Sequence, residues 1–205
     1  MRKSRTRMLV ASVMCWSLLI VGCGSSGSGQ PAPTSTGKPS VTQVGRTQVR
    51  TIGADLEGIV SYKYADSSLG DEWMIIDVAL TGERNESIEV KLSDVSVLTP
   101  DGRRIPLPTQ QEFIDAYPQL QSTLRRAAVA SQPLEATRGG KRACDLNFLR
   151  IPGTGSTRDA IWINQRELCV GMLAFPVDGG IQPGRWKLII ELEESSLEIP
   201  FDLGR

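Results

Sequence analysis

Apolar and polar residues alternate with a period of two through much of the chain after residue 40, and this pattern predicts β-strands. Residues 73–80 give the strongest signal, apolar on both faces near the centre, which is typical of a central strand in a sheet. Turn sequences such as Thr99, Pro100, Asp101 and Gly102 separate the strands. Further strands are expected at 88–92, 95–97, 169–177, 186–192 and 197–203. The pattern predicts a mainly β fold, an antiparallel β-sandwich.

Two places depart from simple alternation. Ser93 and Asp94 shift the phase between two apolar stretches, which predicts a bulge or a corner. Residues 109–131 place apolar residues at helical spacing on both sides of Pro118, which predicts a short helical insertion. The simplest interpretation is a helical crossover that caps one end of the sandwich. The alternative is a binding insertion, because long excursions from a sandwich often carry its function.

The helical insertion also supplies a candidate ligand patch. Arg125 and Arg126 lie off its apolar stripe, and Arg138, Lys141 and Arg142 follow soon after. Together these five side chains could form a small cationic patch for an acidic ligand. A solvated loop explains them equally well.

The first residues have the order of an export signal. A basic stretch precedes an apolar run from Met8 to Gly22, which is shorter than the roughly 20 residues that a transmembrane helix needs. The run ends in Ile20, Val21, Gly22 and Cys23, which resembles the lipobox of bacterial lipoproteins. The resemblance implies a signal peptide over residues 1–22 and lipid attachment at Cys23. Thr6 separates Arg5 from Arg7, so there is no twin-arginine pair and export is expected through the general secretory channel. An ordinary signal peptide with a chance cysteine is the alternative.

The residues after Cys23 predict how the protein is presented. Residues 23–40 consist almost wholly of Gly, Ser, Thr and Pro and predict a flexible tether, so residues 41–205 form the domain. The expected location is the extracytoplasmic side of the cell envelope, with the lipid on Cys23 as the membrane contact. Gly24 is not Asp, which in a source with two membranes resembles the sorting pattern for the outer membrane facing the periplasm.

Charge and composition exclude several classes of protein. Without residues 1–22, the chain carries 19 basic against 23 acidic residues, a net charge of −4 that argues against a nucleic-acid binder. The sequence has no histidine, which removes Ser-His-Asp and Cys-His catalysis and His-ligated zinc. We therefore predict no catalytic residues, no metal and no cofactor.

Two cysteines, Cys144 and Cys169, remain outside the signal peptide and the lipid site. In an exported chain this predicts one disulfide. Cys144 alternates with Leu146 and Phe148 in one predicted strand, and Cys169 shares the face of large apolar residues in another. Both cysteines should therefore point into a core. The alternative is two buried, reduced thiols.

Three stretches together resemble a known group, namely residues 73–80, 92–103 and 171–178. They are similar to bacterial lipoprotein domains of unknown function with a telokin-like, immunoglobulin-type sandwich. The resemblance implies an immunoglobulin-like fold and a cell-envelope address, but no reaction. The helical stretch and the cysteine pair lie outside the resemblance.

Three functions follow as hypotheses. The first is a non-enzymatic envelope module that binds a protein, peptide or glycan partner or supports assembly of a complex. The second is a carboxylate-based glycan hydrolase, for which Glu191, Glu193 and Glu194 are the candidates, since paired carboxylates need no histidine. The third is a carrier of an apolar ligand between the sheets.

Overall fold

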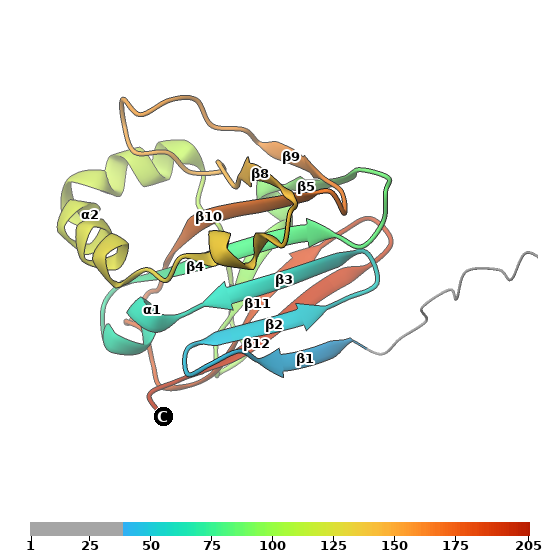
Figure 1. Ribbon diagram of the computed structural model, residues 1–205. Coiled ribbons are helices and arrows are strands. Elements are labelled where there is room, and N and C mark those ends of the chain that lie inside the picture. Colours follow the sequence, from blue (N-terminus) through green and yellow to red (C-terminus); the bar gives the residue numbers. More distant parts are fainter. Residues whose placement is uncertain (1–38) are drawn as a thin grey trace, which may run out of the picture. The chain divides into compact units, whose positions relative to one another are not determined.

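The computed structural model describes residues 39–205, which form two packed β-sheets with helices against one of them (Figure 1). The elements in chain order are β1 Ser40–Gln43, β2 Gln48–Ile52, β3 Leu56–Ser61, α1 Lys63–Ser67, β4 Trp73–Gly82, β5 Ile88–Lys91, η1 Leu92–Asp94, β6 Val95–Leu98, β7 Arg104–Pro106, α2 Gln110–Ala130, η2 Leu134–Arg138, β8 Arg142–Asp145, β9 Ala160–Ile163, β10 Glu167–Pro176, β11 Gly184–Glu191 and β12 Ser196–Leu203.

The strands form a sandwich with a small side ribbon. One sheet has the order β1-β2-β3-β4-β10-β8, and the other has the order β12-β11-β6-β7. Strands β5 and β9 pair with each other in a separate two-stranded ribbon. Every pairing is antiparallel except that of β8 with β10, which is parallel. The structure therefore confirms the predicted fold class of a mainly β, antiparallel sandwich with a helical insertion.

Strand β4 shows why its sequence is apolar on both faces. Ile76 and Val78 point between the two sheets, into a core that also receives Trp186 and Phe201 from the opposite sheet. Ile75, one position along, points to the outer face of the sheet and is covered there by α2. A strand that is buried on both sides loses the usual polar alternation, as the sequence predicted.

Helix α2 confirms the predicted helical insertion. It begins after Thr109, whose side chain accepts a hydrogen bond from the amide of Glu112, while the amide of Thr109 donates to the Glu112 carboxylate over 2.7 Å. The Thr109 amide, and the Thr109 hydroxyl that donates to the same carboxylate, lower the pKa of the Glu112 carboxyl. Phe113 and Leu124 lie in the apolar stripe of α2 and pack with Ile75, so the helix covers the outer face of the six-stranded sheet.

The expected corner lies at η1. On one side of this turn, β6 pairs with β11 in the four-stranded sheet. On the other side, β5 pairs with β9 in the side ribbon. The phase shift at Ser93 and Asp94 thus marks the point where the chain changes sheets.

One strand is shorter than the sequence pattern predicted. Alternation suggested that Cys144, Leu146 and Phe148 share a strand face, but β8 ends at Asp145. The amide of Leu146 still donates to the carbonyl of Val170, after which the chain leaves the ladder. Leu146 and Phe148 are nevertheless buried in the main core, because the irregular segment after β8 folds over it. Burial, and not strand geometry, accounts for the apolar pattern here.

The residue after α2 is hydrogen-bonded to a carboxylate, Asp77, whose titration should make the stability of the fold depend on pH. The hydroxyl of Ser131 donates to Asp77 of β4 over 2.8 Å. Burial raises the pKa of the Asp77 carboxyl, and the charge of Glu135 adds to this effect against the hydrogen bonds from Ser131 and Gln132. A carboxyl whose pKa is higher in the folded state binds more protons folded than unfolded above its unfolded pKa.

We expect Asp77 to reduce stability as the pH rises from about 4, the usual pKa of an unfolded Asp, through its raised folded pKa. The variant Asp77→Asn removes this titration but keeps an oxygen that accepts from Ser131. Urea unfolding from pH 4 to 7 should show the wild type losing free energy of unfolding relative to this variant. The control is Asp115→Asn, an exposed carboxylate on α2, which should run parallel to the wild type. Parallel curves for Asp77→Asn would contradict the expectation.

Candidate ligand-binding groove

A groove opens where β5 separates from the four-stranded sheet. Strand β6 pairs with β11, starting at the pair of Val95 and Ile190. Strand β5, which precedes η1, pairs with β9 instead. The space between β5 and the turn that joins β11 to β12 is therefore not filled by a strand. It forms a hollow of about 670 Å³, within the size range of ligand pockets. The lining residues are Asp55, Arg84, Ile88, Glu89, Lys91, Asp94, Trp162, Glu191, Leu192, Glu193 and Glu194.

Trp162 is the most unusual residue of this lining. Its neighbours Ile161 and Ile163 are buried in the main core, so the alternation of β9 directs Trp162 outward, where 59% of it is exposed. It pairs in register with Glu89 of β5, which places both side chains on the outer face of the ribbon. A large aromatic side chain held in water by a rigid strand is a common feature of binding surfaces.

The groove is strongly acidic. Six carboxylates line it against two basic side chains, Arg84 and Lys91. Part of this charge is balanced, because Asp55 pairs with Arg84 over 2.9 Å, Glu89 pairs with Lys91 over 3.5 Å and Glu191 pairs with Arg104 over 2.6 Å.

Two carboxylates at the tip of the turn are not balanced in this way. Within residues 39–205, neither Glu193 nor Glu194 forms an ion pair. The turn itself is fixed by the amide of Leu192, which donates to the carbonyl of Ser195, and by the Ser195 hydroxyl, which donates to Asp55 over 2.6 Å. A positioned turn therefore holds two free negative charges at the mouth of the groove.

The five basic residues of the predicted cationic patch are not gathered in one place. Arg126 approaches Asp71, just before β4, over 3.6 Å and lies over the ring of Tyr64. Lys141 donates to Thr81 at the far end of β4 over 2.9 Å. At 3.3 Å per residue, β4 separates these contacts by roughly 25–30 Å. The prediction of a single patch does not hold, because α2 and the β8 segment lie at opposite ends of the strand.

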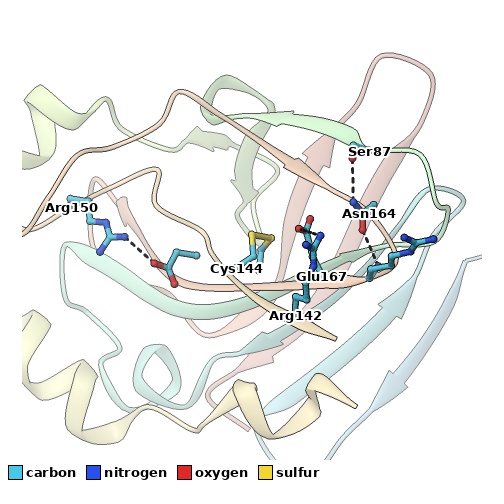
Figure 2. Close-up of a disulfide and its surroundings, with 9 residues drawn as sticks. Ser87, Arg142, Cys144, Arg150, Asn164 and Glu167 are labelled. Atoms are coloured by element: carbon cyan, nitrogen blue, oxygen red, sulfur yellow. Dashed lines mark hydrogen bonds and ion pairs between the residues drawn. A yellow bond between two sulfur atoms is a disulfide. The ribbon is translucent and has the colours of Figure 1, made fainter. Parts of the chain in front are cut away.

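The patch residues thus fall into two groups, with Arg125 beside Arg126 on α2 and Arg138 beside Lys141 and Arg142 near β8. Lys141 and Arg142 of the second group border an open hollow of about 560 Å³ together with Arg166, which the sequence did not suggest. These two side chains have internal partners: Lys141 donates to Thr81, and Arg142 pairs with Glu167 over 2.8 Å beside the disulfide (Figure 2). These contacts explain Lys141 and Arg142 without a ligand.

The structure joins Cys144 and Cys169 in a disulfide, as the cysteine pattern predicted (Figure 2). The bond links the edge strand β8 to β10, in which the two cysteines are register partners. Cys169 is fully buried in the main core. The predicted lipid site at Cys23, the signal peptide over 1–22 and all but the last two residues of the 23–40 tether lie outside the described residues.

The described part of the chain contains neither a membrane-spanning helix nor a metal-ligand cluster. Within residues 39–205, no helix is long and apolar enough to cross a membrane. In the same residues, no three Cys, Asp or Glu side chains converge so that they could hold a metal ion. The groove carboxylates line a surface and do not form a ligand cage.

Only part of this groove could be predicted from the sequence. Glu191, Glu193 and Glu194 were candidates on the sequence alone, and the structure adds Asp55, Glu89 and Asp94 from distant segments. Trp162 was missed, although its signal is present in the sequence: it occupies the solvent position between Ile161 and Ile163.

No family model, curated protein or solved structure matches the chain.

Proposed function

We propose that this protein is a lipid-anchored cell-envelope module that binds a partner through the groove beside Trp162. The proposal assigns signal cleavage and lipidation to Cys23, and the 23–40 stretch serves as the tether that holds the domain away from the membrane. The partner is an envelope protein, peptide or glycan on the extracytoplasmic side. In a source with two membranes, Gly24 favours the outer membrane facing the periplasm.

The observation that carries the binding function is the exposed Trp162 above an acidic groove. Its exposure differs from that of the described rings Phe148, Phe175, Phe201 and Trp186, which are almost fully buried. An exposed aromatic flanked by charged groups offers apolar area and polar contacts together, which is the composition of many binding surfaces. The β-scaffold fixes both in place before a partner arrives, which reduces the entropic cost of binding.

We expect partner binding to depend on Trp162. The full-length protein and its variants are expressed in the source cell, solubilised from the membrane fraction and purified with whatever remains bound. Trp162→Ala should lose the bound partner, since aromatic anchors dominate binding energies. The matched control is Val129→Ala, because Val129 on α2 is 89% exposed but lies outside the groove. Equal recovery with all three proteins would contradict the proposed binding surface.

The lipid anchor has its own test. The intact mass of the membrane-fraction protein should lack residues 1–22 and carry acyl groups. Cys23→Ser should leave the protein unacylated and release it from the membrane fraction. An unacylated wild-type product would overturn the anchor and leave the groove to be tested in a soluble protein.

A second candidate function is a glycan hydrolase, and the six groove carboxylates favour it. The same purified protein, incubated with cell-wall glycan, would then release reducing ends. Glu193→Gln and Glu194→Gln would abolish that release if either residue is the acid or the nucleophile. Binding of glycan without release supports the binding module instead. An apolar carrier is the third possibility, and co-purified lipid identified by mass spectrometry would support it.

A further inference from the structure

The net negative charge of the groove favours a positively charged ligand. Among residues 39–205, Glu193 and Glu194 have no ion-pair partner, and the lining holds six carboxylates against two basic side chains. A ligand with positive charge would complement this surface, and an acidic one would be repelled by it.

Trp162 indicates which kind of positively charged ligand suits the groove. Its register partner Glu89 places a carboxylate beside the indole ring on the same face of the ribbon. A lysine or arginine side chain can lay its apolar stem on the ring and its charge toward the carboxylates. The pair therefore suits a basic side chain better than a small inorganic cation, which gains little from the ring's apolar area.

The backbone of β5 offers a free strand edge toward the groove. The amide of Leu92 donates to the carbonyl of Asp159 on the β9 side. Antiparallel strands alternate the direction of their backbone groups, so the amide and carbonyl of Glu89 point the other way. The amide of Lys91 points there too, and it donates to the Asp94 side chain, which lines the groove. The Glu89 backbone groups are thus placed to pair with an added strand.

A second hollow continues the surface beyond Lys91. It has a volume of about 380 Å³ and is lined by Lys91, Leu92, Ser93, Asp159 and Ala160. Because Lys91 belongs to both linings, the two hollows adjoin along the ribbon. Successive side chains of an extended chain on one face are spaced two residues apart, so one ligand can fill both hollows. Two adjoining hollows favour an extended peptide over a compact small molecule.

We propose that the groove binds an extended basic segment of a partner protein, which adds to the free edge of β5. One lysine or arginine of the segment lies over Trp162 between Glu89 and the Glu193 and Glu194 carboxylates. A neighbouring apolar side chain enters the hollow at Leu92. This inference rests on the proposed binding function and specifies the chemistry of its partner.

Binding of labelled synthetic peptides to the full-length protein in a neutral detergent tests the inference by fluorescence anisotropy. The probe is a peptide of alternating lysine and valine, and the comparison is the same peptide with glutamate in place of lysine. The lysine peptide should bind at least about tenfold more tightly at low salt, and its affinity should fall as added salt screens the charges. A lysine peptide with N-methyl groups on its central amides should bind about fivefold more weakly, since it cannot pair with β5.

Variants of groove residues, with a matched control outside the groove, test whether the peptide binds in the groove. Trp162→Ala should weaken the lysine peptide about five- to tenfold, the range of one cation–aromatic contact. The double variant Glu193→Gln, Glu194→Gln should weaken it about tenfold. The control Asp115→Asn, Asp178→Asn removes two negative charges outside the groove and should bind as the wild type does. Far-ultraviolet circular dichroism confirms that each variant is folded.

Three results would overturn the inference: equal affinity for the glutamate peptide, equal weakening by the control pair, or binding that survives both groove variants. The proposed function fails separately. If Trp162→Ala loses the natural partner but basic peptides do not bind, the groove is a binding site with another ligand chemistry. If neither depends on Trp162, both proposals fail. For a variant that misfolds, protection of residues 88–91 from hydrogen exchange by the lysine peptide, measured on the wild type, decides the case.

Discussion

Replacing Trp186 by alanine is expected to lower the free energy of unfolding by about 3–5 kcal/mol, the largest effect of any single substitution considered. Trp186 lies on β11 with 1% of its surface exposed, between the two sheets. Truncation removes its apolar area and leaves a cavity that the surrounding strands cannot close. It also removes the indole N–H that donates to the carbonyl of Gln182 over 2.9 Å, which leaves that oxygen without its partner.

Chemical unfolding of full-length variants measures this effect, and the chain supplies its own control. Trp162→Ala removes the same side chain from an exposed site, where surface substitutions usually change stability by less than about 0.5 kcal/mol. Trp186→Phe keeps most of the buried volume and should fall between the two. A loss below about 1 kcal/mol for Trp186→Ala would mean that the core is not packed as described.

Loss of the disulfide is expected to cost about 3–4 kcal/mol in the chain-entropy account of cross-links. Cys144 and Cys169 are 25 residues apart, and their bond ties the short edge strand β8 to β10. The double variant Cys144→Ala, Cys169→Ala avoids a buried hydroxyl at the fully buried Cys169. Without the bond, the unfolded chain gains freedom, and β8 retains only four register pairs to hold it.

Guanidinium unfolding of the wild type with and without a reductant should reproduce the loss seen in the double variant. Hydrogen exchange should accelerate first at residues 142–145, because an edge strand opens before the core does. The role assigned to this bond would be contradicted if the unfolding midpoint is the same with and without reductant and the double variant is as stable as the wild type.

The sequence predicted the sheet elements well for a physical reason. In β12 and β11, inward residues such as Leu188 and Ile199 are apolar and their neighbours are mostly polar, so the period of two is visible. In β4, burial on both faces gave a continuous apolar run that also indicated a strand. The segment after β8 misled the prediction, since Leu146 and Phe148 are buried from an irregular loop that mimics alternation.

The groove could not be predicted in the same way. It depends on β5 leaving the sheet at η1 and on Asp55 and Trp162 approaching from distant parts of the chain, which no local pattern encodes. The predicted cationic patch failed for the matching reason. Residues between Arg125 and Arg142 are close in sequence, but Arg126 and Lys141 contact opposite ends of β4 and are therefore far apart in space. Local patterns specify which face a residue occupies, but tertiary pairing decides its neighbours.

The central claim is that the surface around Trp162 meets the partner, and site-specific photo-crosslinking in the source cell tests it most directly. An aromatic photoreactive amino acid at position 162 of the full-length protein keeps a ring where the indole lies, and it should give one discrete crosslinked product on irradiation. The same amino acid at position 129, which is also exposed, should give none. A product at 162 that disappears in the Glu193→Gln, Glu194→Gln background is the result predicted for the acidic groove. Crosslinking at 129 alone, or at neither position, would contradict the account.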